Sequence, residues 1–141
     1  MNLALIIPAL NEAGNIGRVL QSIPPGLVQQ IIVVDNGSTD DTAAQARAGG
    51  AEVVSEPLRG YGQACLTGLA HLRHDIEVVG FLDADGSDDP GRLARLVQPI
   101  RSGEADFVLS ARVLGDARCH LSPQQRFGNW LACVLIRLLW R

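Results

Sequence analysis

The sequence predicts an α/β fold with three layers, in which a mostly parallel sheet is covered by helices on both faces. Two observations predict it. Short apolar runs alternate five times with stretches of helical spacing along the 141 residues, joined by connections of ordinary length. This alternation is typical of parallel sheets built from β-α units. Polar residues follow the apolar runs, as they do at the ligand-binding edge of such sheets.

The first unit begins with a continuous apolar run over residues 3–7, which predicts a central strand that Pro8 closes. A helix follows, because apolar residues recur at helical spacing. These residues are Ile16, Val19, Leu20 and Ile23. The Pro-Pro-Gly sequence at residues 24–26 ends this helix.

The second strand is predicted over residues 30–34 and ends at Asp35. Thr39, Asp40 or Asp41 caps a helix that runs to residue 48, because side-chain oxygens accept hydrogen bonds from the first amides of a helix.

The third strand is predicted over residues 51–55, and a glycine-rich loop follows at residues 56–62. The next helix is predicted over residues 63–74. Its apolar side is formed by Ala64, Cys65, Ala70 and Leu72.

The fourth strand is the apolar run over residues 78–82, which ends in Asp83 and Asp85. Pro90 suits the first turn of the next helix. A fifth strand is predicted over residues 107–110, with Arg112 just past its end. These elements predict a domain over residues 1–114.

Residues 115–141 are predicted to be a linker and an apolar helix. The helix, over residues 124–141, contains two Trp and falls short of the roughly 20 residues that a membrane-spanning helix needs. It suits either the membrane interface or packing against a further element, so contact with a membrane surface or self-association is expected.

Composition excludes several classes of function. The net charge is −3 and no basic stripe is present, so no nucleic-acid partner is expected. All 12 cationic residues are Arg, which excludes a Walker-type phosphate loop with its lysine. Cys65, Cys119 and Cys133 match neither a disulfide framework nor a zinc spacing and are expected to be small buried residues. With no secretory signal evident, a cytoplasmic location is expected.

Polar residues at the strand ends predict the functional site. They are Asn11 and Glu12, Asp35, the loop around Arg59 and Gly60, Asp83 and Asp85, and Arg112. Two carboxylates one residue apart make a half-site for a divalent metal. Carboxylates and arginines together suit a ligand that contains a base or polyol and a diphosphate.

Other uses of Asp83 and Asp85 remain open at this point. The sequence after the first strand lacks the G-x-G-x-x-G of a dinucleotide fold. Residues 81–87, FLDADGS, match the nucleophile motif of haloacid-dehalogenase-like phosphatases. Asp83 would then attack phosphorus, and Asp85 would act as acid and base. That motif normally opens its domain, whereas three β-α units precede it here. A simple acidic loop that caps the next helix is the remaining reading.

Four segments together resemble glycosyltransferase family 2, in particular the branch of dolichyl-phosphate and polyprenyl-phosphate sugar synthases. They are IIPALNE at 6–12, IVVDNGSTD at 32–40, RGYGQA at 59–64 and FLDADG at 81–86. The resemblance extends over about residues 3–112. It implies a GT-A fold, which is a Rossmann-like nucleotide-diphospho-sugar transferase fold.

The resemblance implies a role for each strand-end residue. Pro8, Asn11 and Glu12 would line the nucleoside pocket, and Asp35 would meet the base or ribose. Arg59 and Gly60 would approach the nucleotide, and Arg112 would contact phosphate. The plainer roles are helix capping for Asn11 and Glu12 and a surface ion pair for Arg112.

Asp83 and Asp85 would be the D-x-D pair that holds Mg²⁺ or Mn²⁺ on the diphosphate, which makes Asp85 catalytic through the metal. Ser87 stands where this branch often has Gln as a further ligand. No residue can be assigned as a general base.

The expected reaction is the inverting transfer of a hexose from a UDP- or GDP-linked sugar to a polyprenyl phosphate at the inner face of the membrane. A lipid phosphate is already anionic, so no strong base is needed, and the metal stabilises the leaving nucleotide. The sequence ends before the acceptor part of the family, so a non-catalytic donor-binding subunit is the third reading.

Overall fold

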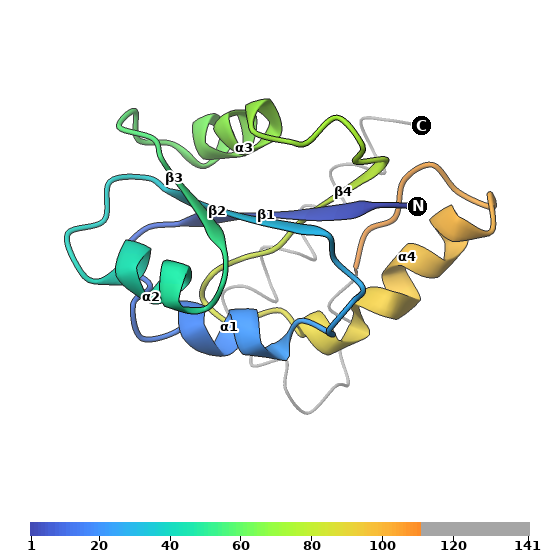
Figure 1. The fold of residues 1–141 in the computed structure, drawn as a ribbon, viewed down its shortest axis with the longest axis horizontal. Helices are drawn as coiled ribbons and strands as arrows, with labels where there is room; N and C mark the ends of the chain where they lie inside the picture. The colour runs from blue at the N-terminus through green and yellow to red at the C-terminus, as the bar shows by residue number, and fades with distance from the viewer. Residues whose placement is uncertain (111–141) are drawn as a thin grey trace, which may run out of the picture. The chain divides into compact units, whose positions relative to one another are not determined.

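The computed structural model describes residues 1–110, and Met1–Val108 form one compact unit. Strands and helices alternate along this unit (Figure 1). They are β1 (Leu3–Ala9), α1 (Ile16–Ser22), β2 (Gln30–Asp35), α2 (Thr42–Ala48), β3 (Glu52–Ser55), α3 (Tyr61–Ala70), β4 (Val78–Phe81), the short 3-10 helix η1 (Pro90–Arg92) and α4 (Leu93–Arg101).

The four strands of the described chain form one parallel sheet in the order β3-β2-β1-β4. α3 covers one face, and α1, α2 and α4 lie on the other (Figure 1). This is the predicted three-layer α/β/α arrangement. Because every strand runs the same way, the carboxyl ends of all four strands lie at one edge of the sheet.

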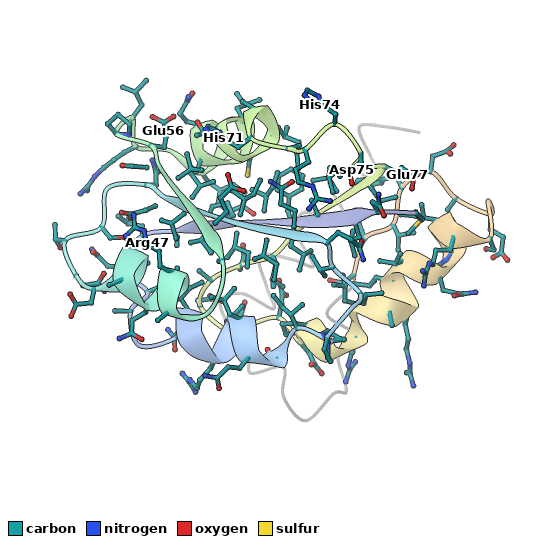
Figure 2. The ribbon with its side chains drawn as sticks, viewed as in Figure 1. Arg47, Glu56, His71, His74, Asp75 and Glu77 are labelled. Atoms are coloured by element: carbon teal, nitrogen blue, oxygen red, sulfur yellow. The ribbon has the colours of Figure 1, made fainter. Side chains whose placement is uncertain are left out.

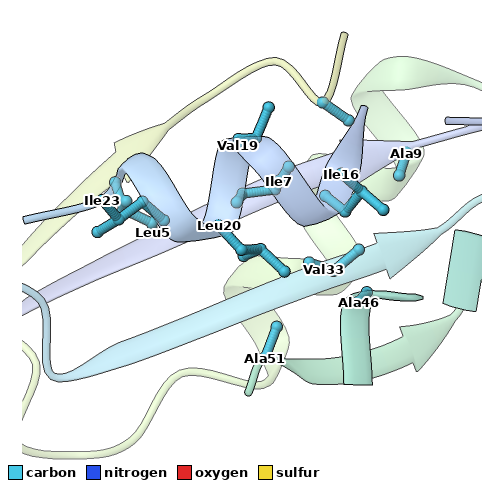
Figure 3. Packing of buried hydrophobic residues seen from close by; sticks show 11 residues of the cluster. Leu5, Ile7, Ala9, Ile16, Val19, Leu20, Ile23, Val33, Ala46 and Ala51 are labelled. Atoms are coloured by element: carbon cyan, nitrogen blue, oxygen red, sulfur yellow. The ribbon is translucent and has the colours of Figure 1, made fainter. Parts of the chain in front are cut away.

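Alternate side chains of each strand point to opposite faces, so the sheet separates two apolar clusters. On one face Leu5 and Ile7 of β1 and Val33 of β2 pack against α1 and against Ala46 of α2 (Figure 3). The other cluster contains Ile6, Ile32, Val34 and Ala64. All three strand residues of this second cluster are fully buried, which rigidly supports the strand ends that follow them.

β1 does not end at Pro8 as predicted but continues to Ala9. Along a parallel strand, successive residues direct their backbone groups to alternate neighbours. The Ala9 carbonyl accepts from Asn36 on the β2 side, whereas the Ile6 carbonyl accepts from the Leu82 N–H on the β4 side. Pro8 therefore faces the β4 side. β4 has already ended there, so the missing N–H of proline breaks no ladder bond.

α3 ends at Ala70, four residues before the predicted end, and Ala70 is exposed rather than apolar-facing. The cause is a tertiary contact. The Gln30 side chain donates from Nε2 to the His71 carbonyl at 3.0 Å and accepts at Oε1 from the Arg73 N–H at 3.0 Å. These bonds use backbone groups that a longer helix would need for itself.

The predicted fifth strand is wrong, since residues 107–110 form no strand and Phe107 is 75% exposed. An apolar run becomes a strand only where a neighbour pairs with its backbone. The predictions for Arg112, the boundary at residue 114 and the helix over 124–141 lie outside the described residues. No helix within residues 1–110 is long and apolar enough to cross a membrane.

Candidate functional site

The carboxyl edge of the sheet carries the predicted site residues. The register aligns Ala9 with Asp35 and Asp35 with Ser55, and Phe81 pairs with Ile6. The loops that leave these strand ends contain every predicted site residue except Pro8 and Asp35, which lie within β1 and β2, and Arg112, which is outside the described chain.

The loop after β1 is fastened to the β2–α2 loop, which we define as residues 36–41. The Asn11 side-chain oxygen accepts from the Thr39 N–H at 2.8 Å, and the Asn11 N–H donates to Ser38 Oγ at 3.0 Å. Asn11 has a φ of 56°, a conformation that asparagine tolerates better than most residues. Its side chain therefore holds the turn and does not cap α1.

A second set of bonds fastens Glu12 to the start of α2. The Glu12 N–H donates to Thr42 Oγ1 at 2.8 Å, and this hydroxyl, which is fully buried, donates in turn to Asp40. Asp40 also accepts from the Ala13 N–H at 3.2 Å. These bonds, that of Thr42 first, lower the pKa of Asp40. The Glu12 carboxylate accepts from the side-chain Nδ2 of Asn15, the residue before α1, at 2.7 Å. This bond is to a side chain and not to a helix amide, so it is not the predicted helix cap.

Asp35 ends β2 and is half-buried. Its Oδ1 accepts from the Ser38 N–H at 3.0 Å. A carboxylate has about four lone-pair sites, so this bond leaves capacity for the N–H of a base or the hydroxyl of a ribose.

The β3–α3 loop, residues 56–60, carries Arg59 and Gly60. Gly60 has a φ of 149°, which favours glycine, and its N–H donates to the side chain of buried Asn36 at 2.8 Å. The Arg59 guanidinium reaches the Gly37 carbonyl at 3.4 Å and is otherwise exposed. Glu56 anchors the loop and lies at the opposite end of the sheet from Asp75 (Figure 2).

Asp83 and Asp85 lie in a turn, because β4 ends at Phe81 and not at Leu82 as predicted. The Tyr61 hydroxyl donates to Asp83 Oδ1 at 3.3 Å, and Asp85 Oδ1 accepts from the Ser87 N–H at 2.8 Å. Burial, and then the charge of Asp83, raise the pKa of Tyr61 to about 12. This phenol therefore stays neutral and remains a donor to Asp83 at neutral pH.

The donor set suits a metal that the substrate helps to bind. No group of three or more His, Cys, Asp or Glu side chains in residues 1–110 could hold a metal ion by itself. Mg²⁺ usually binds one or two carboxylates together with substrate phosphates and water, which matches a pair such as Asp83 and Asp85.

Four residues that support the site were not predicted: Asn36, Thr42, Glu56 and Tyr61. Each makes at least one bond to a residue eleven or more positions away. Thr42 and Glu56 also make shorter-range bonds, to Asp40 and to Leu58 and Gln63. The only signal in the sequence is position: Asn36 and Tyr61 lie within the quoted motifs, and Thr42 and Glu56 lie a few residues outside them. Cys65, predicted as buried, is half-buried beside Tyr61, and burial raises the pKa of its thiol.

The fold and the strand-end carboxylates define a class of α/β proteins whose ligands bind at the carboxyl edge of a parallel sheet. More narrowly, the chain belongs to glycosyltransferase family 2, whose model, described as "Glycosyl transferase family 2", matches residues 4–135. The fold is accordingly the predicted GT-A fold.

Mycobacterial proteins are among the relatives. An uncharacterised glycosyltransferase of Mycobacterium tuberculosis (strain H37Rv) is 44% identical over 108 residues, which are 77% of this chain and 47% of the relative. Glucosyl-3-phosphoglycerate synthase of Mycolicibacterium paratuberculosis is 42% identical over 121 residues, with 77% of this chain and 36% of the enzyme covered. The chain thus spans less than half the length of these relatives.

Solved structures of the M. tuberculosis glucosyl-3-phosphoglycerate synthase match as well. One contains Mn²⁺, UDP and glucosyl-3-phosphoglycerate, and another contains Mg²⁺ and UDP. Each has a TM-score of 0.60 and 39% identity, and the match covers 70% of this chain and 39% of the other. Family membership, together with the three β-α units that precede Asp83, favours the transferase reading over the phosphatase reading.

Proposed function

We propose that this chain is the donor-binding part of a glycosyltransferase that uses UDP-glucose, with a divalent metal held by Asp83 and Asp85. The observation that carries the proposal is the parallel sheet, which directs Asp35, the Arg59–Gly60 loop and the two carboxylates to one edge. Glucose and UDP are preferred because the relatives with named activity are glucosyltransferases whose structures contain UDP.

Each group has a task suited to its chemistry. Asp35 accepts hydrogen bonds from the base or ribose, and Arg59 offers a guanidinium to the diphosphate. Asp83 and Asp85 supply hard oxygen ligands. When bound, Mg²⁺ or Mn²⁺ neutralises charge on the diphosphate and stabilises the departing UDP. Pro8, Asn11 and Glu12 form the wall beside the nucleoside, and Arg112 is proposed as a further phosphate contact.

The acceptor is proposed to carry a phosphate group. The named relatives favour a phosphoglycerate-like acid, whereas the polyprenyl phosphate implied by the resemblance has no support from them. Transfer to 3-phosphoglycerate, and none to a polyprenyl phosphate in vesicles, would decide for the former.

Inversion at the anomeric carbon and a cytoplasmic location, with or without membrane contact, remain predictions. The coupling constant of the anomeric proton in the product tests the inversion.

Calorimetry on the 141-residue chain tests donor binding. We expect UDP-glucose to bind in Mn²⁺ and to bind much more weakly after chelation with EDTA. Asp83→Asn and Asp85→Asn should each remove most of this metal dependence. Asp75→Asn is the matched control, because Asp75 is an exposed carboxylate at the opposite end of the sheet, paired with Arg73 at 2.8 Å.

Two results would contradict the proposal, and a third would limit it to donor binding. Binding that is unaffected by metal and by both substitutions would remove the role of the carboxylate pair. Phosphate release from small phosphoesters, abolished by Asp83→Asn, would instead establish the phosphatase reading. Tight donor binding without transfer to either acceptor would leave a non-catalytic donor-binding subunit.

A further inference from the structure

Asn36 is a buried polar side chain to which the proposed function assigns no contact with substrate. It is 6% exposed. Its Nδ2 donates to the carbonyl oxygens of Glu56 at 2.9 Å and Leu58 at 2.8 Å, and its Oδ1 accepts from the Gly60 N–H at 2.8 Å. Its own N–H donates to the Ala9 carbonyl at 2.9 Å, so the residue is fixed to β1 as well.

The partners of Asn36 demand an amide. Both groups that meet Nδ2 are carbonyls, which only accept, and the group that meets Oδ1 is an N–H, which only donates. A carboxylate of the same shape would keep the bond from Gly60 and would place an oxygen against the carbonyls of Glu56 and Leu58. The three bonds therefore define one position of the loop backbone.

Glu56 holds the same loop from the other side. It is 8% exposed, and its carboxylate accepts from the Leu58 N–H at 2.7 Å, from Gln63 Nε2 at 3.2 Å and from the Thr67 hydroxyl. The bond from Thr67 first, and then that from Leu58, lower the pKa of Glu56. Gln63 and Thr67 belong to α3, so the loop is held between β2 and α3.

The proposed function places Arg59 and Gly60 on the nucleotide, and both lie in the loop that Asn36 and Glu56 hold. Arg59 is exposed, and its backbone lies between Leu58 and Gly60, both of which Asn36 binds. A loop that is ordered before the ligand arrives loses less conformational freedom on binding and binds more tightly.

We propose that Asn36 is a positioning residue for the donor: its buried amide fixes the backbone from Leu58 to Gly60, and so sets where Arg59 and Gly60 meet the diphosphate of the nucleotide sugar. This inference rests on the proposed donor binding. It assigns Asn36 no contact with the substrate.

The chain offers a closely matched control in Gln30, at the other end of β2. Gln30 is 8% exposed, and its Nε2 donates to Glu52 Oε2 at 2.9 Å and to the His71 carbonyl at 3.0 Å. Its Oε1 accepts from the Arg73 N–H at 3.0 Å. It is thus a buried amide with two donated bonds and one accepted bond, remote from the proposed site.

The experiment compares Asn36→Asp with Gln30→Glu in the full chain. Calorimetry with UDP-glucose and Mn²⁺ gives the Kd, urea unfolding gives the stability, and hydrogen exchange reports the amides of residues 58–60 and 71–73. Asn36→Asp should raise the Kd about tenfold or more, where tenfold equals about 1.4 kcal/mol, and speed exchange at 58–60. Gln30→Glu should speed exchange at 71–73 and leave the Kd unchanged.

The outcomes separate the inference from the proposed function. If the native chain binds UDP-glucose and Asn36→Asp binds equally well, or both variants weaken binding alike, the positioning role is wrong and donor binding stands. If the native chain does not bind, both ideas fail. Should Asn36→Asp not fold, Asn36→Ala and Gln30→Ala make the same comparison, with the same expected and contradicting results.

Discussion

Replacing Gly68 of α3 by alanine tests how closely α3 packs against the sheet. The position of α3 also affects the β3–α3 loop, which leads into this helix. An added Cβ would lie 2.4 Å from Ile6 Cγ2 and 3.2 Å from both Ile6 Cγ1 and Cδ1. Ordinary carbon contacts are about 3.5–4.0 Å. Ile6 is fully buried in the central strand, and its branched side chain has little rotamer freedom. The helix must therefore move away by about 1 Å.

Two effects of opposite sign decide the magnitude for Gly68→Ala. Alanine is favoured over glycine within a helix by about 1 kcal/mol. Overpacking a well-packed core costs about 1–3 kcal/mol. The contact at 2.4 Å lies far inside the ordinary range, so the upper part of that cost applies. The net result is destabilisation by about 1–2 kcal/mol, which lowers Tm by roughly 4–10 °C.

A double-mutant cycle with Ile6→Ala gives the decisive measurement, by urea unfolding of all four chains. Ile6→Ala alone should cost about 2–5 kcal/mol. In that background the clash is gone, so Gly68→Ala should become stabilising. Gly62→Ala is the control, because its added Cβ meets nothing within 4 Å. Stabilisation by Gly68→Ala in the native background, or an equal effect in both backgrounds, would refute the reasoning.

Three further predictions follow from the site. Tyr61 is the single tyrosine, and because burial and then Asp83 raise its pKa to about 12, the ultraviolet absorbance of tyrosinate should be absent from the folded chain near the ordinary pKa of about 10. Asp83→Asn should bring ionisation to lower pH, and titration of Tyr61 at about 10 in the native chain would contradict the prediction. The pKa of Glu56 lies below its ordinary 4.5, so its stabilising contribution is present above that pH and is lost as the pH falls below it. The urea midpoint of Glu56→Gln should accordingly vary less with pH in acid than the urea midpoint of the native chain. An equal dependence on pH in the two chains would contradict this prediction. Asn11→Ala should be more destabilising than Asn11→Gly, by about 1 kcal/mol, because its φ of 56° suits glycine; equal unfolding midpoints would show that the conformation is not strained.

The elements that were predicted well are those that local pattern determines. The buried runs of β1 and β2 are continuous and apolar, and they form strands within one or two residues of their predicted bounds. Since the β-α alternation requires a parallel sheet, the position of Asp35, Asp83 and Asp85 at one edge followed from the order of the elements alone.

The features that were missed depend on partners far along the chain. The Gln30 side chain ends α3 through bonds to residues more than forty positions away, and no pattern near residue 70 reports that. Asn36 reaches across 20–24 positions to the β3–α3 loop. An asparagine after a strand-ending aspartate predicts a turn, and only the folded backbone shows that it binds another loop.

The order of the sheet also has a consequence for how the site assembles. β1 pairs with β2 across 26 positions, as in Ala4 with Gln30, but it pairs with β4 across 75, as in Leu3 with Val78. Contacts between distant segments close the largest loop and form slowly. The part of the edge built by β1, β2 and β3, which is proposed to bind the nucleoside, can therefore assemble during synthesis before Asp83 leaves the ribosome. The carboxylate pair completes the edge last, in the turn that follows β4, a strand of four residues with one neighbour in the described sheet.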